Sequence, residues 1–275
     1  MSKKSLPKIT LITFLIFGSI VTLLPVLIVF RTSFQYPRDI ISGKLFFSPT
    51  FYNYISTFTS YKFGRLMINS MVSASGTTVI VLAVASLAGF SLGKFHWSKW
   101  FVSLILAALL LIQMLPPVVF AGPFYLITRQ LGIYDTPLAL IMAYLVLQLP
   151  LSVLILRQFA MAVPNEILEA AHIDGASNQT IFSSVSLPLM MPGIATAGLL
   201  SFVFSWNDFM FAVSLTSTTR AMTIPVGIAN FSQDFQVLYG NISVAAAFAA
   251  IPGFLMVLFA QRYVTRGLTI GAIKG

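Results

Sequence analysis

The chain has 275 residues, of which 57% are hydrophobic and only 8% are charged, and its mean hydropathy is +0.92. A soluble domain has about a quarter of its residues charged, and one core could not bury this much apolar surface, so lipid must solvate much of the chain. The net charge of +9 is scattered along the chain, which favours contact with anionic membrane lipid and gives no reason to propose nucleic acid as a partner.

We predict an all-α, polytopic membrane protein with six transmembrane helices in a single domain covering residues 1–275. The expected spans are residues 9–30, 66–92, 100–120, 138–156, 190–215 and 244–260. The first apolar run is too long for a signal peptide and Arg31 follows it without a small-residue cleavage site, so we expect it to remain as an anchor. The second is rich in Ser, Thr, Ala and Gly, which is typical of membrane helices that pack closely on their neighbours.

Prolines and glutamines mark the third and fourth spans. Pro116 and Pro117 should interrupt the third, because prolines at membrane depth leave backbone carbonyls without partners. Residues 121–131 should then form a helical continuation or an outer interfacial piece, followed by a turn at 132–135. Gln113 and Gln148 are weak candidates for a translocation path, and helix packing is the favoured interpretation of both.

The fifth span should be kinked early by Pro192, and it carries an Asn207-Asp208 pair near its outer end. An ionised Asp in the middle of a membrane helix costs about 2.5–3.5 kcal/mol, so Asp208 should face other helices or a watery cavity. The interpretations that remain open are a pathway or gate position, an interhelical hydrogen-bond site, and a helix end at the membrane interface.

The polar stretch at residues 157–189 predicts two short helices joined by a glycine corner. Pro164, Asn165 and Glu166 form a helix start, and Gly175 is a stop, since glycine adopts the left-handed backbone that ends helices. Ser177 should cap a second helix, which Pro188 should break. On the first helix the exposed acid Glu169 lies beside Ala170 and Ala171, whose small side chains let another surface approach. A solvated loop is the simpler alternative.

One motif in this stretch is similar to the EAA loop of permease subunits in bacterial ATP-binding-cassette importers. It runs Glu169-Ala170-Ala171, three residues, Gly175, nine residues, Val185, one residue and Leu187-Pro188; the usual pattern has isoleucine at the position of Val185. In that family the loop forms a coupling helix that sits in a cleft of the ATPase subunit. The resemblance implies an ATPase-coupling role for Glu166, Glu169, Ala170, Ala171, Asp174, Gly175, Leu187 and Pro188.

From about Pro116 onward the chain also resembles the maltose-type carbohydrate permeases, especially the second of their two permease subunits. Trp206-Asn207-Asp208-Phe209 and the tail Gly271-Ala272-Ile273-Lys274-Gly275 carry this likeness. It implies a mono- or oligosaccharide substrate, and a contact of Gly271, Lys274 and Gly275 with the ATPase; a bare solvated tail is the alternative.

Enzymatic activity is not expected from this chain. It has no G-x-x-x-x-G-K-[ST] phosphate loop, so we predict no cofactor here and place ATP and Mg²⁺ on a separate ATPase subunit. Without cysteine there can be no disulfide or thiolate metal site. His96 and His172 are far apart in sequence, in predicted inner loops away from a pocket, so we predict no metal site and no serine–histidine–acid set.

The resemblance therefore predicts an importer subunit in the bacterial cytoplasmic (inner) membrane, with both termini in the cytoplasm. Its expected partners are a second permease subunit of different sequence, two ATPase subunits and an external solute-binding protein. Basic residues are only slightly more frequent on the inner side, so this orientation depends on the motif. Two rivals remain: a permease of this architecture for another solute, such as a polyamine, and an ion-coupled secondary transporter that uses Asp208.

Overall fold

The computed structural model describes the backbone of residues 8–233 and 236–272; the side chains of residues 8, 9, 11, 233, 236, 260 and 262–272 fall outside this description. The chain divides into two compact units, which are described separately here. The first comprises Met1–Phe63 and Gly227–Ile251, and the second comprises Gly64–Val226 and Pro252–Gly275.

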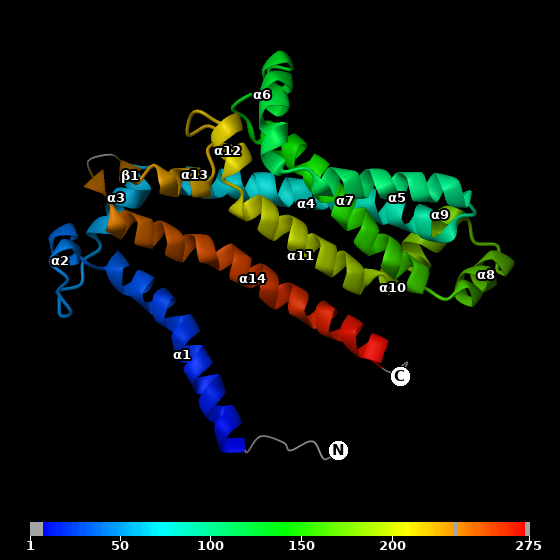
Figure 1. The fold of residues 1–275 in the computed structure, drawn as a ribbon, viewed down its shortest axis with the longest axis horizontal. Coiled ribbons are helices and arrows are strands. Elements are labelled where there is room, and N and C mark those ends of the chain that lie inside the picture. Colours follow the sequence, from blue (N-terminus) through cyan, green and yellow to red (C-terminus); the bar gives the residue numbers. More distant parts are fainter. Residues whose placement is uncertain (1–7, 234–235, 273–275) are drawn as a thin grey trace. The chain divides into compact units, whose positions relative to one another are not determined.

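Helices make up nearly all of the described secondary structure (Figure 1). They are α1 (Lys8–Ser33), α2 (Pro37–Ile41), α3 (Tyr52–Thr59), α4 (Phe63–Lys94), α5 (Lys99–Met114), the 3₁₀ helix η1 (Pro117–Phe120), α6 (Ala121–Gln130), α7 (Pro137–Ala162), α8 (Asn165–Ile173), α9 (Asn178–Thr180), the π-helix η2 (Ile181–Ser186), α10 (Leu187–Leu189), α11 (Met191–Asn207), α12 (Met210–Leu215), α13 (Ile224–Ala229) and α14 (Tyr239–Ala272). The strands within the described ranges are β1 (Ser232–Gln233) and β2 (Gln236–Val237), an antiparallel pair in which Ser232 faces Val237. The predicted all-α class is confirmed.

Four described helices are long and apolar enough to cross a membrane: Ile12–Ser33, Phe63–Lys94, Pro137–Ala162 and Tyr239–Phe259. Two bent helix pairs raise this number to six if each pair makes one crossing. Lys99–Met114 and Pro117–Gln130 are bent by 95°, and Asn178–Leu189 and Met191–Asn207 by 75°. The six-span count thus stays a prediction, while the interruption expected at Pro116 and Pro117 is confirmed.

Two predicted boundaries are wrong. The fourth span continues to Ala162, so residues 157–162 belong to α7 rather than to the loop, because neither proline nor glycine occurs from residue 157 until Pro164. The fifth span is not continuous: α11 ends at Asn207 and α12 begins at Met210. The apolar sequence continues across this break, so hydropathy alone does not reveal it.

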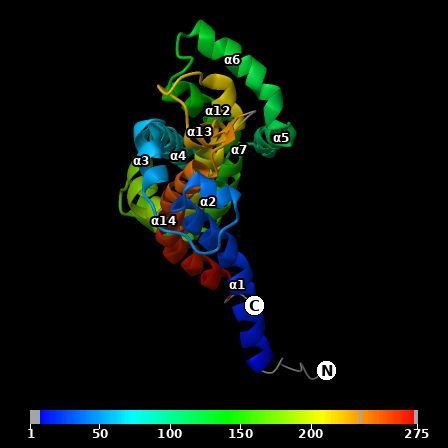
Figure 2. The same ribbon diagram turned by 90° about the vertical axis from the view of Figure 1, so that its left-hand side faces the viewer.

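In the first unit, two asparagine amides tie the outer elements together. Asn53 of α3 donates through Nδ2 to the carbonyl oxygens of Ser33 (3.0 Å) and Gln35 (2.7 Å), which fixes the end of α1 to α3. Asn241 of α14 donates to Thr57 Oγ1 (3.0 Å) of the same helix α3. Figure 2 shows α2 beside the C-terminal end of α1. Hydrogen-bonded amides therefore organise this unit alongside its aromatic contacts.

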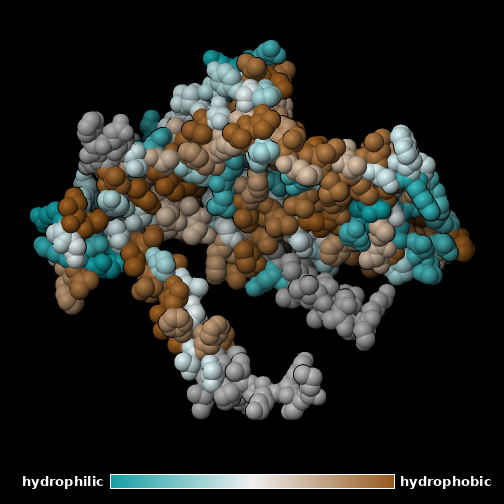
Figure 3. Space-filling view, in the orientation of Figure 1, coloured by the Kyte–Doolittle hydropathy of each residue, from teal (hydrophilic) through white to brown (hydrophobic). Residues whose placement is uncertain are grey.

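In the second unit, α7 packs against both α5 and α11. Two buried clusters fill this unit. One lies around Tyr144, Phe124, Phe211 and Leu215, where α6, α7 and α12 meet; the other lies beneath α8 and is described below. Figure 3 shows hydrophobic residues over the middle of this unit and hydrophilic ones at the end where α8 lies.

Candidate functional site

Helix α8 presents almost its whole circumference to solvent. Pro164 precedes it with extended backbone (φ −59°, ψ 135°), and the helix begins at Asn165 as predicted. Leu168 is its buried residue, whereas Glu166, Glu169 and Ala170 are exposed. This exposed surface holds acids and small residues together with Ile167 and Ile173, and Leu168 anchors it, so it can accept a partner without rearrangement of its own core.

Gly175 ends α8 in a Schellman motif. The Gly175 N–H donates to the His172 carbonyl and the Ala176 N–H to the Ala171 carbonyl, both at 3.0 Å. The φ of Gly175 is +79°, in the left-handed region that glycine adopts at low cost. The predicted glycine corner is therefore confirmed, and it follows Asp174, which is exposed at the C-cap.

The second helical segment begins as predicted but ends later. Ser177 Oγ accepts the Thr180 N–H (3.2 Å). The helical run Asn178–Leu189 continues one residue past Pro188, where the break was expected, and then bends by 75° into α11. Pro192 follows this bend in the first turn of α11, where its missing N–H is tolerated.

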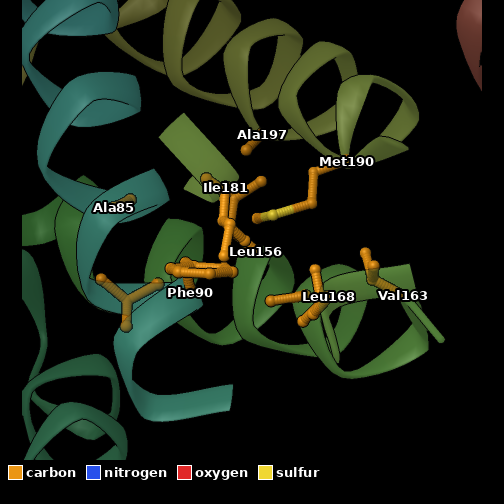
Figure 4. Close-up of a cluster of buried hydrophobic side chains, with 10 residues drawn as sticks. Ala85, Phe90, Leu156, Val163, Leu168, Ile181, Met190 and Ala197 are labelled. Carbon is orange, nitrogen blue, oxygen red and sulfur yellow. The ribbon is translucent and has the colours of Figure 1, made fainter. Parts of the chain in front are cut away.

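A buried apolar cluster supports α8 and the helical run Asn178–Leu189 that follows it (Figure 4). Leu156, Ile181 and Met190 point toward one another, and Leu168 of α8 lies beside Val163. Met190 and Leu156 are fully buried. Because these residues come from α7, α8, η2 and the start of α11, the exposed helix α8 packs on the end of α7 and the start of α11.

Lys94, the last residue of α4, reaches this segment directly. Its Nζ donates to the carbonyl oxygen of Val163 (2.5 Å) and to Asn165 Oδ1 (2.7 Å). This contact was not predicted from the sequence. A 69- to 71-residue separation leaves no local pattern that could have revealed it.

Both histidines lie against a cavity of about 210 Å³ beside α8, so the expectation that they lie away from any pocket is wrong. His96, His172, Glu169 and Lys94 are among its lining residues. Among the described residues, no group of three or more His, Cys, Asp or Glu side chains could hold a metal ion.

Asp208 is a hydrogen-bonding centre at the break between α11 and α12. Its Oδ2 accepts the Tyr144 hydroxyl (3.0 Å) and the backbone N–H groups of Phe211 and Ala212 (both 3.1 Å). It thus satisfies two N–H groups at the start of α12, which fits the helix-end interpretation. Its place in a translocation path stays a prediction. Sequence reasoning missed Tyr144 as its partner.

The other candidates for the translocation path, Gln113, Gln148 and Asn207, make separate contacts in the structure. Gln113 of α5 donates to the Leu147 carbonyl of α7 (2.9 Å), which is the packing role favoured from sequence. Gln148 is 4% exposed, and its Nε2 has no hydrogen-bond partner. Asn207 is exposed and donates to the Val203 carbonyl of its own helix (2.8 Å).

The predicted C-terminal contact cannot be placed. Lys274 and Gly275 lie outside the described residues, and Gly271 belongs to the last turn of α14, where only the backbone is described.

Comparison with known proteins agrees with this geometry. Residues 85–270 match the family described as "Binding-protein-dependent transport system inner membrane component". The chain is 38% identical to the trehalose transport system permease protein SugB of Mycobacterium tuberculosis, over 92% of this chain and 93% of that protein. It is 32% identical to the trehalose/maltose transport system permease protein MalG of Thermococcus litoralis, over the full length of both.

A similar fold occurs in the crystal structure of a bacterial ABC transporter involved in the import of the polysaccharide alginate. The TM-score is 0.78 at 19% sequence identity, with 93% of this chain and 95% of that chain covered. At this identity the likeness concerns the fold alone. The family match spans more than half of the chain and includes α7, α8 and α11, so the protein belongs to the family of binding-protein-dependent transport system inner membrane components.

Proposed function

We propose that this chain is a permease subunit that imports a mono- or oligosaccharide by alternating access, driven by ATP hydrolysis on a separate subunit. The exposed helix α8, ended by Gly175 and seated on the inner ends of α7 and α11, is the observation that carries the proposal. An exposed structured helix between two membrane helices is suited to receive force from a soluble partner and to pass it to both.

The substrate class is drawn from the relatives. Two of them, at 38% and 32% identity over nearly the whole chain, are named for trehalose or maltose transport. We propose a neutral carbohydrate for this chain too, and the scarcity of charged side chains in its membrane helices is consistent with that.

The proposed assembly has four membrane-associated subunits. Two permease chains, of which this is one, form the path; two ATPase subunits bind ATP and Mg²⁺; and an external binding protein delivers the sugar. In this arrangement Glu166, Glu169, Ala170, Ala171, Asp174, Gly175, Leu187 and Pro188 form the ATPase-coupling surface. The two units of the chain act as one transmembrane domain in the bacterial inner membrane, and both termini and α8 lie in the cytoplasm.

The test is purification of the complex through a tag on this chain, identification of its subunits, and reconstitution in proteoliposomes. With binding protein outside and ATP inside, we expect uptake of labelled trehalose or maltose that stops when ATP is replaced by a non-hydrolysable analogue. A complex without a nucleotide-hydrolysing subunit would contradict the proposal.

The same vesicles separate the rivals. Spermidine uptake in place of sugar uptake would favour a permease for another solute. Uptake driven by a proton or sodium gradient without ATP would favour a secondary carrier that uses Asp208.

A further inference from the structure

A single ammonium group joins three helices at the inner end of the second unit. Lys94 ends α4, Val163 is the C-cap of α7, and Asn165 is the first residue of α8. The two bonds from Lys94 Nζ, at 2.5 and 2.7 Å, therefore hold the corner between α7 and α8 against the end of α4. Hydrogen bonds from a charged donor are about twice as strong as neutral ones.

The same end of α4 is packed closely on α7. Gly89 and Gly93 are four residues apart and lie on one face; a Cβ at Gly89 would come within 2.7 Å of the Arg157 backbone nitrogen, and one at Gly93 within 3.2 Å of Ala160 Cβ. Small residues at this spacing let membrane helices approach backbone to backbone. Arg157 Nε adds a bond to the Leu92 carbonyl (3.3 Å). The ends of α4 and α7 near Lys94 are thus in close backbone contact.

We propose that Lys94 is a positioning residue for the coupling helix, which it ties to α4 so that a displacement of α8 moves α4 together with α7. Along the chain α8 is joined only to α7 and to the α9–α11 segment. Phe90 and Ala85 of α4 share the apolar cluster that holds Leu168 of α8, and the lysine adds a directional polar connection from α4 to a residue 71 positions away in sequence. This inference rests on the proposed function, since it concerns how α8 transmits force.

A simpler role for Lys94 would be that of a positive charge with no specific partner. A cation at a helix C-terminus interacts favourably with the helix dipole, and inner loops of membrane proteins favour bases. The preference of inner loops for bases is met equally well by any nearby base, whereas the interaction with the dipole depends on position. Lys99, exposed at the start of α5 and close to Lys94 in sequence, is therefore the matched control.

The test compares Lys94→Met, Lys94→Arg and Lys99→Met in the purified complete complex. Hydrogen exchange of the α8 amides reports the tether directly, and sugar taken up per ATP hydrolysed reports coupling. For Lys94→Met we expect about tenfold faster exchange in α8 and about tenfold less uptake per ATP, the size expected from loss of a charged hydrogen bond. Lys94→Arg should restore most of both, and Lys99→Met should change neither.

Exchange and uptake in Lys94→Met equal to those of Lys99→Met would overturn the proposal. So would a loss of uptake without faster exchange in α8, or a failure of Lys94→Arg to restore either measurement. Failure of the proposed function shows separately, as ATP-independent uptake by the unmodified complex, whereas the exchange measurement still reports the tether.

Discussion

The hydroxyl of Tyr144 lies 3.0 Å from Asp208 Oδ2, and this hydrogen bond joins the middle of α7 to the break between α11 and α12. Tyr144 is fully buried and belongs to the apolar cluster that also contains Phe211. An ionised carboxylate inside a membrane helix is energetically costly. That of Asp208 lies at a helix end, where one side chain and two backbone N–H groups donate hydrogen bonds to it.

Replacing Tyr144 with Phe should destabilise the protein, although the substitution creates no cavity. The ring stays, while the carboxylate loses one donor at a buried site, a change worth about 1–3 kcal/mol. The thermal midpoint of the purified protein in detergent checks this. Tyr239→Phe is the control, because Tyr239 is 54% exposed. Equal midpoints for the two variants would show that the Tyr144–Asp208 bond contributes little.

Substitutions at the glycine corner should uncouple transport while leaving insertion intact. Gly175 has a φ of +79°, which proline cannot adopt, so Gly175→Pro should abolish uptake. Glu169→Lys should do the same by reversing an exposed charge on the proposed coupling surface.

Alanine substitutions provide the graded comparison. Gly175→Ala should cost about 1 kcal/mol locally. Gly122→Ala, in α6 with open space at the Cβ position, should be neutral. Uptake in vesicles with matched protein content is the measurement, and unmodified uptake in both Gly175→Pro and Glu169→Lys would refute a coupling role.

The coupling segment could be predicted from sequence because its signals are local. Pro164, Ser177 and Gly175 act on backbone groups within a few residues, and each does in the structure what its residue type favours. Pro188 predicts the end of the second helical run to within one residue. A π-helical turn over Ile181–Ser186 precedes it, and the run continues through Leu189.

Contacts between distant segments could not be predicted in this way. Lys94 with Asn165 and Tyr144 with Asp208 are separated by 71 and 64 residues, and such pairs leave no periodic pattern. The helix break after Asn207 had a signal that went unused, since Asp favours positions just before a helix. The apolar residues on either side concealed it.

Close packing of α4 on α7 predicts a steric effect at Gly89. An added Cβ would lie 2.7 Å from Arg157 N and 2.9 Å from Leu156 C, and backbone atoms cannot move aside as a side-chain end can. Gly89→Ala should therefore cost about 1–3 kcal/mol or more through overpacking. Gly18→Ala in α1 is the control, because nothing lies within 4 Å of its Cβ position. Thermal midpoints of the two variants test this, and a stabilised Gly89→Ala would contradict the backbone contact.

Asp135, in the loop before α7, predicts that the stability of the protein depends on pH. Asp135 accepts the N–H groups of Ser217 (2.9 Å) and Thr218 (3.1 Å) and the Thr218 hydroxyl (2.5 Å), which ties this loop to the one after α12. Partial burial works to raise the pKa of Asp135. The bonds from Thr218 and Ser217 and the charge of Arg220 outweigh it and hold the pKa below its ordinary value.

Because the folded-state pKa is lowered, the stabilisation is present above the unfolded value of about 3.9 and is lost as the pH falls through the lower folded value. At neutral pH Asp135→Asn should melt below the unmodified protein, and this difference should shrink in acid once Asp135 is protonated. Thr218→Val should move the midpoint of that decline to higher pH, since it removes the hydroxyl that favours the ionised carboxyl. Melting curves of the three proteins between about pH 7 and pH 2.5 provide the measurement. A difference that stayed constant over this range would show that the charge of Asp135 does not stabilise the tie between the two loops.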